Sequence, residues 1–442
     1  MKQNRNRKSY VMLKHFATLG LSGLFGISGV LGLWEMPVLG AVYNTDEGDV
    51  TITAITEKDT ISGAGNLYYS APAAGTDFMI HDKASDLTGF TGTATLTNVR
   101  LKIRNQAQFG SANSVPTYVV NSGSQLWLYG GGAHLTGNVT LSGHGTNSKD
   151  ASRMGALRFE SDSSFSGSVT LADDATISSF YYNQGGAAKN LKATVDLAGH
   201  TLYLGCSPDY DPSSFAWEAN SSYWFTDLTV SGKISGDGTL VIRNTKKIYL
   251  TNTENDFTGD IDVQVGTLAI TNNAALGAGN LTVMNIGENG VFDYSGGDIS
   301  NLKVTGNGKI YYHGTGSGAS TINLHNTNKT YNASEFTGTI DVENTRLQVR
   351  EQSQLGAGAD ADGNPQVTVN VKNGAQLWVL GNGTTNPITA TFNIAGMGYN
   401  SGNDGQGAIR LEVSSSIAGV VNLMDDARFQ RIIIRKLARV RT

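Results

Sequence analysis

Residues 336–382 decide the fold, and they read FTGTIDVENTRLQVREQSQLGAGADADGNPQVTVNVKNGAQLWVLGN. Runs in which apolar residues alternate with polar ones, such as Arg346–Val349 and Gln376–Val379, are separated by segments rich in Gly and Asn. A strand points successive side chains to opposite faces, and Gly and Asn favour the tight turns between strands. The separating segments leave no room for a helix. This stretch therefore predicts short β-strands joined by turns.

The same sequence pattern, called a phrase below, recurs at two other places in the chain. Phe-Thr-Gly begins at Phe90, Phe257 and Phe336, and each copy continues through a short strand to a Phe-Gly or Leu-Gly turn. Longer phrases recur as well, since GALRFE at 155–160 returns as GAIRLE at 407–412. A single repeat of this kind buries its apolar face only by stacking on its neighbours. We therefore predict an all-β parallel β-helix with roughly 20–25 residues per coil, and keep tandem β-sandwiches as the alternative.

Composition agrees with an ordered β-protein. Gly is abundant (55 residues) and only 16% of the residues are charged, which is also typical of flexible low-complexity chains. However, 39% of the residues are hydrophobic and regularly spaced, so a core can form. Cys206 is the only cysteine, which excludes an intramolecular disulfide and a thiolate metal cage. A low cysteine count suits a bacterial protein that crosses membranes unfolded.

The first 41 residues have the order of a secretory signal peptide. Basic residues precede an apolar run from Phe16 to Leu33, and small residues follow at Gly40 and Ala41. This order predicts a cleaved signal after Ala41, with an uncleaved membrane anchor as the alternative. We therefore expect the protein to be exported.

Charge is distributed unevenly along the chain. The chain holds 32 basic and 37 acidic residues, and both of its ends, 1–41 and 428–442, are basic, so residues 42–427 are strongly acidic. An acidic body argues against binding of nucleic acid or of an anionic membrane by electrostatics.

We divide the chain into four parts. Residues 1–41 are the signal peptide, 42–79 an N-terminal cap or lead-in, and 80–427 the β-helix, with a less regular excursion at 176–250. Residues 428–442 form an atypical basic tail, which begins abruptly inside a repeat. A frameshifted or truncated gene explains this tail more simply than an amphipathic helix on an anionic membrane does.

The recurring phrase resembles the autotransporter-associated β-strand repeat, which belongs to passenger domains of Gram-negative type V secretion proteins. The resemblance is carried by Phe-Thr-Gly, Leu-Gly-Ala-Gly and Gly-Ala-Gln-Leu, is clear at 257–283 and 336–380, and is recognisable at 90–128. It implies a right-handed parallel β-helix on the cell surface, serving as an adhesin or as the stalk of one. It also implies an outer-membrane barrel, and no part of this sequence supplies one. We therefore expect a C-terminally incomplete solenoid.

Chemistry-bearing motifs are few. The histidines are dispersed without metal-ligand spacing, and neither HExxH nor GxSxG occurs. The pairs Asp173-Asp174 and Asp425-Asp426 recur at matching repeat positions, where carboxylates could bind calcium or act as acid and base. Duplication of an Asp-favouring turn explains them more simply. We predict no catalytic, cofactor-binding or metal-ligating residues; the histidines considered are His81, His134, His144, His200, His313 and His325.

Aromatic residues are the best candidates for ligand contact, because sugars and protein surfaces stack well on them. For two of them, Trp127 and Trp378, core packing or stacking between coils is the simpler interpretation. The sequence thus predicts a non-enzymatic, adhesin-like surface protein whose partner is a host or cell-surface protein or a glycan. The alternative is a polysaccharide-binding or polysaccharide-cleaving β-helix. The weakly predicted contact residues are Tyr210, Trp217, Trp224, Trp127 and Trp378.

Overall fold

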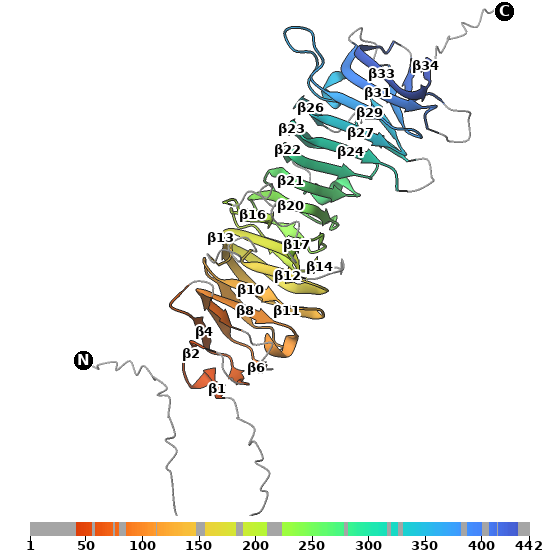
Figure 1. Cartoon of the computed structure of the whole chain (residues 1–442). Helices are drawn as coiled ribbons and strands as arrows, with labels where there is room; N and C mark the ends of the chain where they lie inside the picture. The colour runs from red at the N-terminus through yellow and green to blue at the C-terminus, as the bar shows by residue number, and fades with distance from the viewer. Residues whose placement is uncertain are drawn as a thin grey trace, which may run out of the picture.

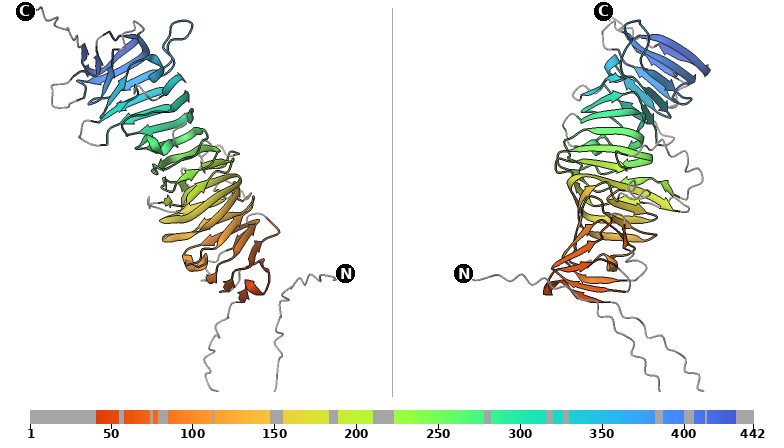
Figure 2. Two further views of the ribbon diagram at one scale, coloured as in Figure 1. Left: turned by 180° about the vertical axis from the view of Figure 1, so that it is seen from behind. Right: turned by 60° about the vertical axis from the view of Figure 1, so that its left-hand side comes forward.

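The computed structural model shows an elongated rod of stacked strands, with β1 (Val42–Asn44) and β34 (Phe429–Arg431) at opposite ends (Figure 1). Two further views show the same rod from behind and from the side (Figure 2). The structure describes residues 41–54, 58–73, 76–78, 85–111, 113–146, 155–182, 189–209, 223–277, 282–315, 320–325, 330–381, 387–399, 406–412 and 414–431.

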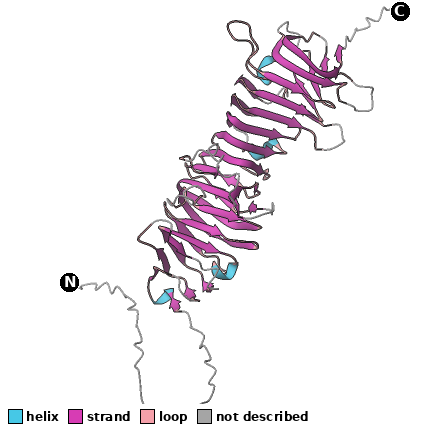
Figure 3. Cartoon of the chain, in the orientation of Figure 1, coloured by secondary structure: helices cyan, strands magenta, loops and turns pink. Residues whose placement is uncertain are grey.

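The regular elements are almost all strands, with a few single-turn 3-10 helices between them (Figure 3). The 3-10 helices are η1 (Thr45–Glu47), η2 (Gln106–Gln108), η4 (Asn273–Leu276) and η5 (Gln352–Gln354). The remaining strands are β2 (Val50–Ile52), β3 (Thr60–Gly63), β4 (Asn66–Ser70), β5 (Thr76–Phe78), β6 (Asp86–Phe90), β7 (Thr93–Thr97), β8 (Val99–Ile103), β9 (Thr117–Val120), β10 (Gln125–Leu128), β11 (Ala133–Gly143), β12 (Leu157–Glu160), β13 (Ser163–Tyr182), β14 (Lys189–Leu191), β15 (Thr194–Asp196), β16 (Thr201–Gly205), β17 (Tyr223–Phe225), β18 (Leu228–Val230), β19 (Ile234–Ser235), β20 (Thr239–Leu250), β21 (Ile261–Ile270), β22 (Thr282–Tyr294), β23 (Leu302–Gly306), β24 (Lys309–His313), β25 (Thr321–Asn323), β26 (Tyr331–Phe336), β27 (Thr339–Glu343), β28 (Arg346–Val349), β29 (Thr368–Val371), β30 (Gln376–Val379), β31 (Ile388–Gly396), β32 (Ile409–Leu411) and β33 (Ile417–Ala427).

Parallel pairing between successive coils defines the architecture. β20 pairs in parallel with β21, and β21 with β22, so each coil lies directly on the one before it. A parallel partner must be reached by a crossover, and here the crossover is the rest of the coil. The predicted all-β parallel β-helix is therefore confirmed for the described residues.

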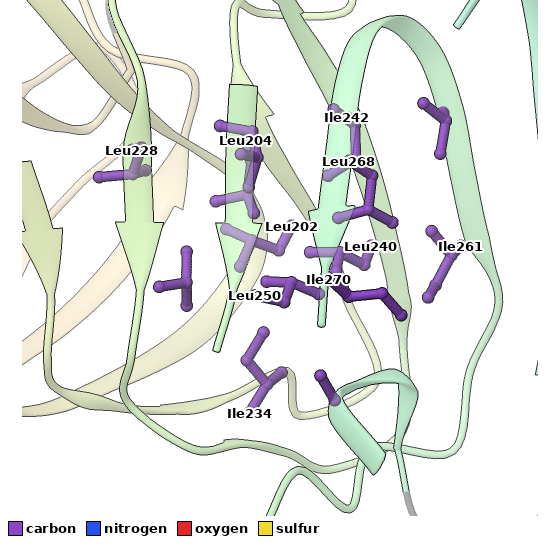
Figure 4. Packing of buried hydrophobic residues seen from close by; sticks show 14 of the residues in the cluster. Leu202, Leu204, Leu228, Ile234, Leu240, Ile242, Leu250, Ile261, Leu268 and Ile270 are labelled. Carbon is purple, nitrogen blue, oxygen red and sulfur yellow. The ribbon is translucent and has the colours of Figure 1, made fainter. Parts of the chain in front are cut away.

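The core is a column of aliphatic side chains that runs through the coils. Leu202 pairs with Leu240 in register, and Leu240 pairs with Ile261, so equivalent positions stack above one another (Figure 4). All three are at most 1% exposed. Burying a side chain of this size contributes about 1.5–3 kcal/mol, and no single coil could hide it alone.

The Phe-Thr-Gly phrase marks a point of close approach between one coil and the next. Its phenylalanine is at most 2% exposed in all three copies, at Phe90, Phe257 and Phe336. Its glycine lies against a carbonyl oxygen of the preceding coil, so close that an added Cβ would overlap that oxygen. The distances from such a Cβ would be 2.0 Å for Gly92 to Gly65, 1.4 Å for Gly259 to Gly238, and 2.0 Å for Gly338 to Gly308.

The turn that follows each copy differs from the expectation of strands without helices. Residues there form the 3-10 helices η2, η4 and η5. Each one ends near a glycine with a positive φ, for example 101° at Gly277. The chain then bonds back to the buried phenylalanine, as Ala357 N donates to Phe336 O at 2.8 Å. A helix of one turn has no apolar period, so the alternation pattern does not reveal it.

The region 176–250, which the sequence marks as less regular, contains strands that stack in the same columns. β16 pairs in parallel with β13 and with β20. Coil length varies more than expected, since Leu157 pairs with Ile177 across a short coil but Leu204 pairs with Ile242 across the coil that contains 210–222. β17 is exceptional because it pairs antiparallel with the end of β13.

At the far end of the rod, β33 is open to solvent. It pairs with β31, and among the described strands none covers its other edge. Leu423 and Met424 are 65% and 68% exposed. The described start of the basic tail continues the repeat, because β34 pairs in parallel with β32 just as β13 pairs with β12.

Two sequence predictions fall outside the described residues. The signal segment lies there except for Ala41, and so do residues 432–442 of the basic tail. Within the described ranges, the structure holds no helix with the length and apolar character needed to cross a bilayer.

Candidate functional site: stacked aromatic and charged faces

Trp127 lies between two cationic side chains from the coils on either side of it. The parallel register pairs it with Lys102 of β8 and with Arg158 of β12. The Lys102 Nζ atom is 4.5 Å, and the Arg158 guanidinium carbon 3.6 Å, from the centre of the indole ring. The Trp127 side chain is 7% exposed. Such a sandwich gains cation–π attraction of about 1–2 kcal/mol per cation when desolvated.

A buried carboxylate completes this cluster. The Trp127 Nε1–H donates to Glu160 Oε2 at 2.5 Å, and Arg158 Nη2 lies 3.8 Å from the same oxygen. Burial raises the pKa of Glu160, and the nearby Arg158 charge opposes that rise. The side chains of Lys102, Trp127 and Arg158 come from three successive coils and hold them in register. Trp127 offers almost no surface to a ligand.

The second block builds a looser version of this sandwich around Trp378. The register places Arg410 of β32 beside it, with the guanidinium carbon 4.1 Å from the ring centre. Arg346 lies on the other side at 5.3 Å. Arg410 also pairs with Glu412 at 2.8 Å. Trp378 is half-buried, and its Nε1–H finds no acceptor among the described residues.

The other three predicted contact residues belong to the excursion near 206–225. Tyr210 and Trp217 lie outside the described residues. Trp224 lies in β17, opposite Tyr181 of β13. The base of the excursion is a small apolar cluster of Phe180, Cys206 and Phe225, which is separate from the main core. The rings of Phe180 and Phe225 meet edge to face, 5.2 Å apart.

A row of charged groups extends from β20 to Lys372, which directly follows β29, and no sequence motif predicted it. Lys247 Nζ lies 2.7 Å from Asp293 Oδ2, and His313 Nε2 lies 2.7 Å from Asp293 Oδ1. Farther along, Lys372 Nζ donates to Glu343 Oε2 at 2.8 Å. These partners come from different coils, so only the coil register could have revealed them.

Glu343, in the same charged row, has a perturbed pKa. Lys372 and the Tyr311 hydroxyl, which donates at 2.9 Å, hold the pKa of this carboxyl below its usual value. The Tyr311 pKa is raised to about 12, by burial first and then by its bond to Glu343. Lys372 neutralises the charge of Glu343, and the neutral Tyr311 hydroxyl donates to it, which suits a stable outer surface better than a catalytic pair.

A polar cleft of about 430 Å³ lies where the turns 253–255, 272–277 and 298–301 stack. Its amide groups are engaged with the backbone: Asn255 Nδ2 donates to Ala275 O at 2.8 Å, and Asn273 Nδ2 donates to Ser300 O at 3.1 Å. The cleft is therefore built from the hydrogen bonds that fasten one turn to the next.

The Asp pair of the first block acquires a histidine neighbour. One ligand atom each from Asp173, Asp174 and His200 lie within 4.8 Å of one another. Sequence spacing predicted no metal-ligating residues here, because His200 follows the pair by one full coil. Asp425 and Asp426 form the same local turn, in which Asp426 N donates to Asp425 Oδ1 at 2.8 Å as Asp174 N does to Asp173 Oδ1.

Comparisons with known proteins give one distant relative. No protein-family model matches the chain, and no solved structure matches it. Over 190 residues the chain is 26% identical to the protein named Adhesin BmaC autotransporter from Brucella suis biovar 1 (strain 1330). The match covers 40% of this chain and 5% of that relative, so the chain corresponds to a small part of the relative's length. Part of the chain is thus similar to an autotransporter adhesin.

Proposed function

We propose that the chain is a non-enzymatic, adhesin-like passenger that is exported and displayed at the surface of a Gram-negative bacterium. The observation that carries this proposal is the parallel β-helix itself, combined with the partial similarity to an autotransporter adhesin. A rod of stacked coils extends far for its mass and offers a long lateral surface, which suits a structure that reaches toward another cell.

Most of the charged and aromatic side chains described above contact neighbouring coils, which supports a role in stabilising the rod. Charged groups between coils are paired, as in Lys247 with Asp293 and Lys372 with Glu343. The indole of Trp127 is enclosed by its neighbours. These arrangements stabilise the rod and leave little of these side chains for ligand contact.

We assign the contact to the aromatic residues of the excursion, Tyr210, Trp217 and Trp224. Trp127 and Trp378 have the role of coil stacking in this proposal. The partner is a protein or a glycan on a host or neighbouring cell surface, because aromatic side chains stack on both.

The test is adhesion of bacteria that display the chain, compared with bacteria that display variants. Replacement of Tyr210 and Trp217 by Ala should reduce binding to cultured cells or to a glycan array by about tenfold or more. Tyr249→Ala, on β20, is the matched control and should bind like the parent. Unchanged adhesion in the double variant would place the contact elsewhere, and absence of adhesion by the parent would refute the adhesin proposal.

A polysaccharide-cleaving activity on the same fold is the competing function. It is tested by the release of reducing sugar from acidic and neutral glycans incubated with the purified chain. We expect none above background; robust turnover would replace the adhesin proposal with an enzymatic one.

A further inference from the structure

The corner that carries Asp173 and Asp174 is a break in the regular ladder between β11 and β13. Leu141 pairs with Leu171, but the next pair is Gly143 with Ala175, so residues 172–174 bulge out of the strand. Bulges of this kind re-aim side chains and are built features rather than defects. Here the bulge points two adjacent carboxylates away from the core, and the Asp173 side chain reaches solvent.

The following coil brings a histidine to the same corner. Ala175 pairs with Leu202 of β16, so the residues just before them also lie side by side. Thr201 N donates to Asp174 Oδ1 at 2.7 Å, which fixes the position of that carboxylate. His200 therefore stands beside the bulge, although a whole coil separates it from the Asp pair in sequence.

The three side chains are close enough together to share one ion. Their ligand atoms lie within 4.8 Å of one another. Bonds of about 2.0–2.2 Å to a common ion place two ligands roughly 3–4 Å apart, so a small closure of the corner suffices. Among the described residues, no hydrogen bond or ion pair engages the His200 ring. The imidazole and one oxygen of each carboxylate remain available.

Two other sites in the chain contain a histidine or an Asp pair but lack the arrangement found at this corner. His313 lies 2.7 Å from the carboxylate of Asp293, so that pair leaves no space for an ion between them. Asp425 and Asp426 repeat the bulge turn, yet the described residues provide no histidine within ligand distance of them. The combination of bulge, carboxylate pair and unbonded imidazole is found at one corner of the described structure.

We propose that Asp173, Asp174 and His200 form a binding site for a divalent transition-metal ion, with Zn²⁺ as the best fit. One imidazole nitrogen with two carboxylate oxygens is a donor set that suits zinc, whereas calcium prefers oxygen ligands alone. Three protein ligands leave at least one coordination position for water or for a group on a partner. The ion would join two successive coils.

The experiment is isothermal titration calorimetry with ZnCl₂ on the full chain without an affinity tag. Asp173→Asn with Asp174→Asn removes two charges while keeping Oδ1 of residue 174 for Thr201, and His200→Gln removes the imidazole with little change of volume. Asp425→Asn with Asp426→Asn is the matched control, and His313→Gln is a control for loss of any histidine. Far-UV circular dichroism establishes that each variant has folded.

We expect the parent chain to bind Zn²⁺, and we expect the His200 and Asp173/Asp174 variants to bind at least about tenfold more weakly, since even the loss of a supporting group costs about 10–100-fold. The two control variants should bind like the parent. The proposal is overturned if the parent does not bind Zn²⁺, if the site variants keep the parent affinity, or if the controls lose as much as they do. Calcium binding that ignores His200 would also overturn it.

Discussion

The two blocks of the chain place the same residue in two different environments. Leu171 begins the phrase LADDA, and Leu423 begins the matching phrase LMDDA. Leu171 is 2% exposed because β15 and β16 stack on β13, whereas Leu423 is 65% exposed in the open strand β33. Replacement of each by Ala is therefore a matched pair in which the chemistry is constant and only burial changes.

The expected costs follow from that burial. Leu171→Ala removes a fully buried side chain and leaves a cavity, which costs about 2–5 kcal/mol. Leu423 is only about one third buried, so the transfer term, about 1.5–3 kcal/mol for complete burial, shrinks to under about 1 kcal/mol. The difference between the two variants should therefore be at least about 1–2 kcal/mol.

The assay must be local, because repeat proteins can unfold in parts. Native-state hydrogen exchange reports the opening free energy of each segment, read from the amides of β13 in one variant and of β33 in the other. Opening of β33 is expected to be easy even in the parent chain. If Leu423→Ala destabilised its segment as much as Leu171→Ala does, β33 would be covered in solution, and the inference drawn from its exposure would be refuted.

Three further outcomes follow from the geometry. Trp127→Phe should cost about 1–3 kcal/mol more than Trp378→Phe in urea unfolding, because only Trp127 donates to a buried carboxylate; equal costs would show that the indole N–H contributes nothing. Lys372 and Tyr311 lower the pKa of Glu343 below 4.5, so its stabilisation is present above pH 4.5 and is lost as the pH falls through the lowered value. The decrease in melting temperature from pH 6 to pH 3 should therefore be smaller for Glu343→Gln than for the parent chain. An equal decrease in the two proteins would contradict this prediction. Limited proteolysis should cut first within 206–225, because this segment breaks the sequence repeat, whereas an initial cut within 336–380 would contradict the prediction.

The repeat phrases in the sequence were enough to predict the parallel β-helix, because a repeated phrase must stack. The structure adds the reason for the phrase: the phenylalanine fills the core, and the glycine permits backbone contact with the preceding coil. The 3-10 helices η2, η4 and η5 were not predicted, since their single turns follow no apolar period. The strands within 176–250 stack like the others because parallel pairing needs only an alternating edge and no particular motif.

Predicting side-chain partners was harder than predicting strands. Stacking between coils was one interpretation of Trp127, but its enclosure by Lys102, Arg158 and Glu160 depends on which residues share a register. A turn can be predicted from the Gly or Asn residues of a single coil. An ion pair such as Lys247 with Asp293 joins two coils that are not adjacent in sequence, so local sequence does not predict it. Without the strand register between coils, the residues of the charged row are only polar residues scattered along the sequence.

The same reasoning explains why a metal site on a solenoid escapes sequence motifs. A helical motif such as HExxH has fixed spacing because the helix has a fixed period. In a β-helix the spacing between neighbouring ligands is the length of one coil, and that length varies here from the coil between Leu157 and Ile177 to the coil between Leu204 and Ile242. His200 reaches Asp173 and Asp174 through such a coil, so no constant offset identifies the triad. To find a metal site that is built from successive coils, the corners of the coils must first be aligned. The side chains at equivalent positions of neighbouring coils can then be compared.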